Sequence, residues 1–185
     1  MENARNFKVY LTIHELLIDR GHLDITIPNL VDFTRAFTSR EALTFITLIG
    51  TLVYFSDDPT IGIKQMQKLA ELMKENHLTK CIFVYPRTLT FSAKRFLSLE
   101  RSLKIEMFCD TELIINVTRH VLAPCYRLVS TSERKKLSTK YGGQFPRILV
   151  SDPVAKYYGM RCNDVVEVSR YSETAGDYVL YRICV

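Results

Sequence analysis

Arginine and tyrosine side chains gather in residues 144–182, and their chemistry suits recognition of another protein better than catalysis. Arginines form planar, bidentate hydrogen bonds with carboxylates, and tyrosines offer a large contact area with a polar end. The residues in question are Arg147, Arg170, Arg182, Tyr157, Tyr158 and Tyr181. An internal salt bridge, for example to Asp152 or Glu173, is an alternative use for Arg147 and Arg170. Some of the tyrosines must be core residues.

A second polar group lies at residues 87–95, where hydroxyl and cationic side chains precede and open an expected helix. Free N–H groups and the helix dipole favour phosphate oxygens at such an end. We therefore expect a backbone contact to duplex DNA, which gives affinity without reading sequence. The residues that would make it are Arg87, Thr90, Ser92, Lys94 and Arg95. The alternative is that Thr90 only caps the helix and the cations are solvated.

Catalytic motifs are missing from the sequence. It contains no GxxxxGK[ST] phosphate loop, no GxGxxG, no GxSxG elbow and no HExxH pair. A Mg²⁺-dependent nuclease would need a lysine beside its acidic residues, and Glu106-Met107-Phe108 lacks one. Asp57-Asp58 is better explained as a solvated loop, and His14 as a structural residue. We expect no catalytic residue, no metal and no cofactor.

Composition indicates one domain or two small ones with a hydrophobic core: 185 residues, 47% hydrophobic and 24% charged. The formal charge of +5 is uneven, since residues 118–185 hold 11 Lys plus Arg against 6 Asp plus Glu, while residues 1–117 hold 14 of each. Five scattered cysteines suggest neither a disulfide framework nor a CxxC metal site. With no expected membrane span or secretory signal, we expect the protein to stay inside the cell. We expect no small-molecule substrate.

The first part of the chain alternates helical and strand patterns. Apolar spacing predicts helices over 4–20, 29–37 and 63–76, and a further helix opening at 88–92. Strands are expected within 43–55, joined by a turn at Gly50-Thr51, and at 80–85 and 103–108. Strands that alternate with helices argue for an α/β layer with partly parallel strands.

The last part of the chain predicts a smaller unit. A strand is expected at 126–129, followed by a helix that Ser130 and Glu133 cap and that ends near Tyr141. A two-turn helix begins at Pro153, capped by Ser151 or Asp152, and closes at Gly159. Strands at 165–169 and 178–185 form a hairpin with its turn at Gly176-Asp177. Alternation on the last strand favours a core position for Tyr181.

These residues resemble a known family. The segments PRI (146–148), DPVAKYYG (152–159), VVEV (165–168) and R-x-SETAG-x-Y-V-x-YR (170–182) closely resemble the C-terminal domain that the fifth subunit of eukaryotic nuclear RNA polymerases shares with its archaeal counterpart. The first part is similar to the eukaryotic subunit through DDPTIGIKQM (57–66), KCIFVYP (80–86), TLTFSAK (88–94) and ELIINVTRHVLAP (112–124). Departures include Phe91 in place of the family's usual proline.

The resemblance implies an α/β jaw domain at 1–117, with a mixed sheet and flanking helices, and a small α+β assembly domain at 118–185. It implies a non-catalytic polymerase subunit that docks on the largest subunit beside other subunits, with the jaw near downstream duplex DNA. The implied docking residues are Arg147, Asp152, Pro153, Tyr157, Tyr158, Gly159, Arg170, Ser172, Glu173, Thr174, Gly176 and Arg182.

The expected location is the nucleus or, for a virus-encoded copy, the host nucleus, a cytoplasmic virus factory or the virion. Two other functions remain open from the residues alone. One is a free-standing nucleic-acid-binding protein that uses the same basic surfaces. The other is a degenerate nuclease.

Overall fold

The computed structural model describes residues 2–100, 102–174 and 176–185, without the side chains of Glu2 and Ala36. The chain divides into two compact units, residues 1–115 and 116–185, each with its own sheet. The expected boundary, between residues 117 and 118, lies two residues further along. No helix in the described part of the chain is long and apolar enough to cross a membrane.

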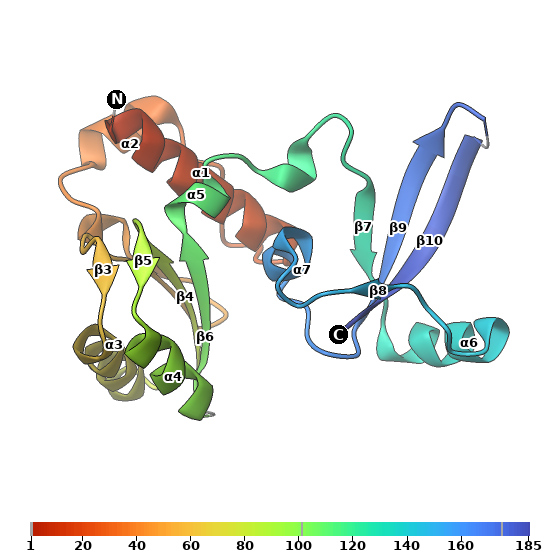
Figure 1. The fold of residues 1–185 in the computed structure, drawn as a ribbon. Coiled ribbons are helices and arrows are strands. Elements are labelled where there is room, and N and C mark those ends of the chain that lie inside the picture. The colour runs from red at the N-terminus through yellow and green to blue at the C-terminus, as the bar shows by residue number, and fades with distance from the viewer. Residues whose placement is uncertain (1, 101, 175) are drawn as a thin grey trace. The chain divides into compact units, whose positions relative to one another are not determined.

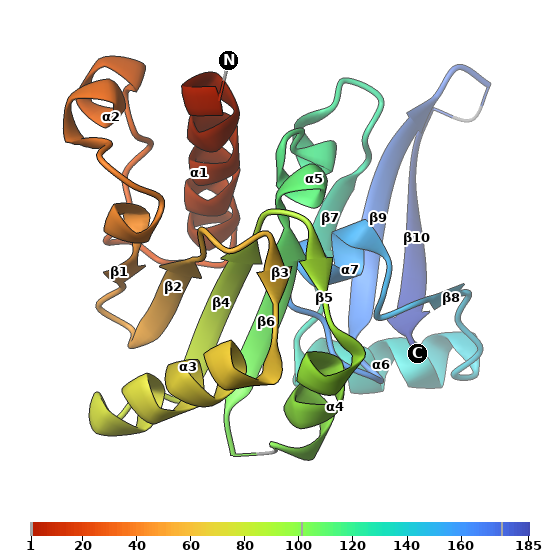
Figure 2. The same ribbon diagram turned by 60° about the vertical axis from the view of Figure 1, so that its left-hand side comes forward.

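The first unit is built on a four-stranded sheet of order β1-β2-β4-β6. Its strands are β1 (Phe45–Ile46), β2 (Thr51–Phe55), β4 (Lys80–Tyr85) and β6 (Lys104–Cys109). β2, β4 and β6 run parallel, and β1 pairs antiparallel with β2. Parallel neighbours need crossover connections, which α3 (Ile63–Glu75) and α4 (Phe91–Leu99) supply (Figure 1; Figure 2). The expected α/β layer with partly parallel strands is confirmed.

Helices flank both faces of this sheet, because alternate residues of a strand point to opposite sides. Leu52 of β2 lies in a buried cluster with Met66 and Met73 of α3. On the other face, the Phe55 ring lies 5.9 Å from the ring of Tyr10 in α1 (Glu2–Asp19). The second helix, α2 (Leu30–Ala36), begins where Asn29 accepts a hydrogen bond from the Val31 N–H. The helices expected at 4–20, 29–37 and 63–76 are thus present.

The sequence patterns did not predict several short elements of the first unit. The helix expected to open at 88–92 begins only at Phe91, because the preceding residues form a strand. β5 (Thr88–Leu89) pairs in parallel with β3 (Thr60–Ile61) as a separate two-stranded sheet. The unit also contains a 3₁₀ turn at Glu41–Leu43 and α5 (Asp110–Leu113).

His14 gives the first unit a pH-dependent stability. Its side chain is 7% exposed, and its Nδ1 lies 2.9 Å from the Tyr10 carbonyl. Burial lowers the pKa of His14 below 6.5, against the opposing effect of that hydrogen bond. The folded state therefore favours the neutral form of His14. The contribution of this preference to the free energy of unfolding is complete above the unfolded pKa of 6.5. It is lost as the pH falls below 6.5 toward the lower pKa of the folded state.

We expect the free energy of unfolding of the first unit to fall between pH 7.5 and 5.5, and to fall less in His14→Gln. Burial also lowers the pKa of His22, so His22 accounts for part of the remaining slope. Urea titrations at the two pH values measure this difference. An unchanged pH dependence in the variant would contradict it.

The second unit has a four-stranded sheet of order β7-β9-β10-β8. Its strands are β7 (Cys125–Leu128), β9 (Val165–Ser172), β10 (Gly176–Cys184) and β8 (Arg147–Ile148). β9 pairs antiparallel with β7 and β10, while β8 pairs in parallel with β10. A 3₁₀ turn at Val117–Arg119, α6 (Thr131–Tyr141) and α7 (Pro153–Tyr157) complete it. The expected capping box of α6 is present, because Ser130 accepts from the Glu133 N–H and Glu133 from the Ser130 N–H.

One face of this sheet carries the buried core of the second unit. Val166, Val168 and Cys184 pack there with Ala155 of α7. Tyr181 lies on the opposite face, half-buried, with its ring 5.8 Å from the Tyr141 ring. The prediction of a core position for Tyr181 is therefore wrong. Alternation separated the two faces of the strand correctly but did not say which one is covered.

The hairpin turn also lies elsewhere than expected. Gly176 pairs with Ser172 and Asp177 with Tyr171, so Gly176-Asp177 belongs to strand β10. Glu173 and Thr174 lie in the turn, and Gly176 adopts a φ of +67°, which glycine tolerates best. The sequence pattern detected the glycine but assigned the turn too late.

Candidate docking and nucleic-acid surfaces

The motif DPVAKYYG builds a short helix end. Asp152 Oδ1 accepts a 2.9 Å hydrogen bond from the Val154 N–H, and Pro153 takes the first helical position. Gly159 has a φ of +62°, in the left-handed region. These three residues of the expected docking set therefore shape the backbone.

The two tyrosines of that motif differ in position. Tyr157 is 3% exposed, and its hydroxyl accepts a 3.1 Å hydrogen bond from the Asn116 amide. Tyr158 is half-buried, and its ring lies 6.1 Å from that of Tyr126 beside the core. Both rings therefore help to position the helix within the chain.

The hairpin presents the exposed part of the expected docking set. Arg170, Glu173 and Thr174 are exposed, and Ser172 is half-buried. The Thr174 N–H donates to the Ser172 hydroxyl at 3.4 Å, which orders the turn. These residues therefore lie at or near the turn that joins β9 and β10. Figure 1 shows the hairpin that the two strands form.

The remaining arginines lie on the same sheet, further from the hairpin turn. Arg147 in β8 is exposed, and Arg182 in β10 is half-buried. Among the ion pairs of the described residues, none includes Arg147 or Arg170, so the internal salt bridges considered as alternatives are not seen. Their guanidinium groups remain available for a partner's carboxylates.

Arg127 is a positioning residue that the sequence did not reveal. Its guanidinium lies 2.8 Å from Glu167 in β9 and 3.3 Å from Glu133 in α6. The hydrogen bond from Arg127 lowers the pKa of Glu167 below its usual range, and capping of the Ser130 N–H lowers that of Glu133. The sequence alone does not predict this ion pair, because it depends on the β7–β9 register, which places Arg127 opposite Glu167.

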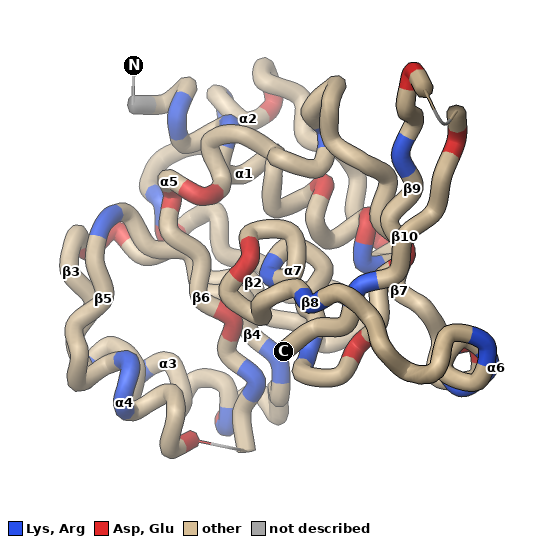
Figure 3. Tube along the Cα trace, turned by 45° about the vertical axis from the view of Figure 1, so that its right-hand side comes forward, with Lys and Arg blue, Asp and Glu red and all other residues tan. Residues whose placement is uncertain are grey.

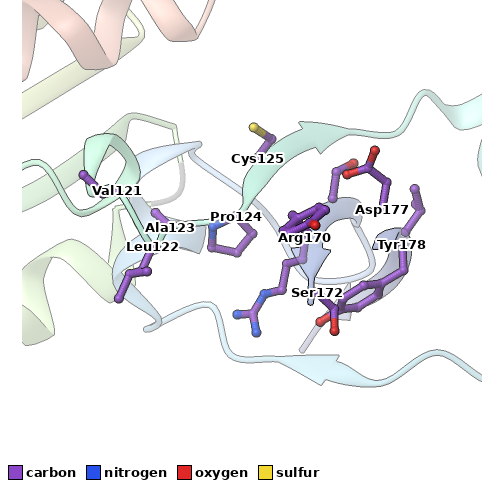
Figure 4. A pocket seen from close by; sticks show the side chains of 12 residues that line it. Val121, Leu122, Ala123, Pro124, Cys125, Arg170, Ser172, Asp177 and Tyr178 are labelled. Carbon is purple, nitrogen blue, oxygen red and sulfur yellow. The ribbon is translucent and has the colours of Figure 1, made fainter. Parts of the chain in front are cut away.

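A groove of about 790 Å³ opens beside the hairpin. Residues 121–125, just before and at the start of β7, form one side, and residues of β9 and β10 form the other (Figure 4). Val121 is 96% and Leu122 85% exposed, so the groove has an apolar rim. Arg170 and Asp177 bring charge to its other side.

The expected DNA-proximal residues lie between the end of β4 and the middle of α4. Arg87, Ser92, Lys94 and Arg95 are exposed around the start of α4. Thr90 is the cap: its hydroxyl donates to the Ile61 carbonyl at 2.9 Å and accepts from the Ala93 N–H at 3.3 Å. Thr90 thus caps the helix, and the three cationic side chains are exposed, as both the DNA contact and its alternative require.

Basic side chains also gather on α6, which has no buried residue. Figure 3 shows the blue of Lys and Arg on this helix. They are Arg134, Lys135, Lys136 and Lys140.

Within the described residues, no group of three or more His, Cys, Asp or Glu is placed to hold a metal ion. The class of protein that these features define is a two-unit binding scaffold.

Comparison with known proteins identifies the family. The family model described as "RNA polymerase Rpb5, C-terminal domain" matches residues 115–184. The chain is 35% identical over 193 residues to "DNA-directed RNA polymerases I, II, and III subunit rpabc1" of Dictyostelium discoideum, covering 98% of each chain. It is 31% identical over 206 residues to subunit RPABC1 of Caenorhabditis elegans, covering 100% of this chain and 98% of that one. The chain belongs to the Rpb5 family of RNA polymerase subunits.

Proposed function

We propose that residues 118–185 dock this chain onto the largest subunit of a DNA-directed RNA polymerase, and that residues 1–117 form part of the lower jaw near downstream DNA. The chain itself is a non-catalytic subunit of a multisubunit DNA-directed RNA polymerase, as its full-length similarity to the RPABC1 subunits shows. That similarity is the observation that carries the proposal. The proposed location is the nucleus, where polymerases of this type act.

The structure supports docking through the second unit in two ways. The hairpin tip carries polar side chains that are exposed and ordered, and the neighbouring groove has an exposed apolar rim. Protein interfaces combine these features, with apolar area at the centre and arginine at the anchors. Of the expected docking residues, we assign direct contact to Arg147, Arg170, Ser172, Glu173, Thr174 and Arg182. Asp152, Pro153, Tyr157, Tyr158 and Gly159 shape and hold α7, and Gly176 shapes the end of the hairpin turn.

Affinity purification of the tagged full-length chain from its own cells tests the proposal. Other polymerase subunits, including the largest, should elute with it in equal amounts. A chain that elutes alone, and that binds duplex DNA tightly at about 150 mM salt, would instead support the free-standing nucleic-acid-binding protein. Mg²⁺-dependent cleavage by the purified chain would support the nuclease.

The contact with downstream DNA makes a separate prediction. In the assembled polymerase, replacing Arg87, Lys94 and Arg95 together by alanine should weaken binding of downstream duplex DNA. Each lost phosphate contact should reduce the salt dependence of log K by about 1. Alanine at Lys64, Lys68 and Lys74 of α3 removes the same charge elsewhere on the first unit and should leave the salt dependence unchanged. Equal effects of the two triple variants would contradict a specific contact.

A further inference from the structure

Strand β10 has an unpaired outer edge along its first half. It runs from Gly176 to Cys184, but β8 pairs with it only at Ile183 and Cys184. No other strand in the described part of the second unit pairs with this side of β10 (Figure 2). The edge nearest the hairpin tip is therefore open.

The hydrogen bonds show which backbone groups face outward. The Ile183 N–H donates to the Pro146 carbonyl at 2.9 Å, so Ile183 directs its backbone groups toward β8. Because the direction alternates with period two, Asp177, Val179 and Tyr181 also direct their N–H and C=O groups outward. The Tyr181 ring lies 6.4 Å from the Phe145 ring, so the chain just before β8 runs beside this position. Asp177 and Val179 are left, with no backbone partner among the described residues.

This edge has few of the features that usually protect one, and its charged residues are Asp177 and Arg182. Exposed edges are blunted by lysine, proline, a bulge or short length. Residues 176–182 contain no lysine or proline, and the strand is nine residues long. Val179 and Leu180 are 49% and 40% exposed. The opposite outer strand, β7, has only four residues. An open edge of this kind can pair with a strand from a partner protein, which would extend the sheet.

We propose that the outer edge of β10 from Gly176 to Leu180 takes up an extended segment of the largest polymerase subunit as an added strand. This inference rests on the proposed docking function and adds its mode: main-chain hydrogen bonds supply affinity and alternate side chains supply specificity. The open edge measures about 14 Å at 3.4 Å per residue. It adjoins the hairpin tip with Arg170 and Glu173, so one docking surface includes both.

The side chains beside the edge define the chemistry of the segment. Val179 and Leu180 point to opposite faces of the sheet, and each offers apolar area to a neighbour on its own face. Arg182 shares the face of Leu180, two residues beyond the open edge, where it suits an acidic side chain at that end of the segment. Asp177 shares the face of Val179, where it suits a basic one. The segment is therefore extended, apolar at its centre and charged at both ends.

Residue-resolved hydrogen exchange of the full chain, alone and in the assembled polymerase, tests the added strand. The amides of Asp177 and Val179 should exchange fast in the isolated chain and at least tenfold more slowly in the polymerase. The amides of Tyr178 and Leu180 point toward β9 and should be protected in both. Fast exchange at Val179 in the polymerase, with slowed exchange at Glu173 and Thr174, would overturn the added strand and leave docking intact. No change anywhere in 118–185 would overturn both.

A pair of variants at one position separates backbone from side chain. Val179→Pro removes the outward N–H without removing a bond to β9, and proline is tolerated at such edge positions. It should lower recovery of the polymerase at least tenfold, whereas Val179→Ala should stay within twofold. Equal recovery would overturn the proposal. If circular dichroism shows that Val179→Pro does not fold, the exchange experiment decides. A dimer of the isolated chain with a protected Val179 amide would show that a second copy, not another subunit, occupies the edge.

Discussion

Asp110→Ala is expected to lower the free energy of unfolding of the first unit by about 3–5 kcal/mol, because it leaves a buried arginine without its buried, hydrogen-bonded counter-charge. Arg40 and Asp110 form two parallel hydrogen bonds of 2.8 Å, with side chains 12% and 3% exposed. Arg40 also donates to the Asn6 side chain at 2.8 Å and to the Ser56 carbonyl at 3.0 Å. The pair thus links α1, the segment after β2 and the start of α5.

The control is Asp57→Ala, at the same arginine. Asp57 lies 3.8 Å from Arg40 and its side chain is 50% exposed, so its removal should cost less than about 1 kcal/mol. Urea titration, with hydrogen exchange of the β2 and β4 amides reporting on the first unit, measures both variants. Similar losses for Asp110→Ala and Asp57→Ala would show that burial of the pair does not set its contribution.

Reversing two charges at the hairpin, Arg170→Glu with Glu173→Lys, should lower recovery of the polymerase at least tenfold. Both side chains are exposed, and the double exchange leaves the net charge of the chain unchanged. The fold should therefore persist, while a partner surface complementary to the original charges meets like charges, at a cost of several kcal/mol. A loss of about 1.4 kcal/mol already corresponds to tenfold.

The matched control exchanges the same charges on the first unit, as Lys68→Glu with Glu71→Lys on the exposed side of α3. This variant should be recovered with the polymerase like the unaltered chain. Circular dichroism of both purified variants checks the fold. Undiminished recovery of the hairpin variant would mean that the tip does not contact the partner.

Local chemistry made much of the fold predictable. The capping box at Ser130 and Glu133 and the helix framed by Pro153 and Gly159 depend on neighbours within a few residues. Apolar spacing located the long helices of the first unit for the same reason. The strands that were missed, β3, β5 and β8, are two residues each, too short for any periodicity to show.

The candidate site was predictable in its composition but not in its roles. The family resemblance assigned Asp152, Tyr157 and Arg170 to the same docking set. In the structure Asp152 caps a helix, Tyr157 is buried and Arg170 is exposed. The link from Arg127 to Glu167 depends on strand register, and the pair Arg40–Asp110 joins residues 70 positions apart. The open edge of β10 exists because β8 pairs only with Ile183 and Cys184. The residue types along β10 do not show where this pairing ends.

Site-specific photo-crosslinking from the hairpin tests the docking claim most directly. A photoreactive residue in place of Thr174, in the exposed turn, should crosslink to the largest subunit in purified polymerase. The same group in place of Gln67, exposed on α3, should not form that crosslink. The result that would contradict the account is an assembled polymerase in which position 174 forms no crosslink to the largest subunit.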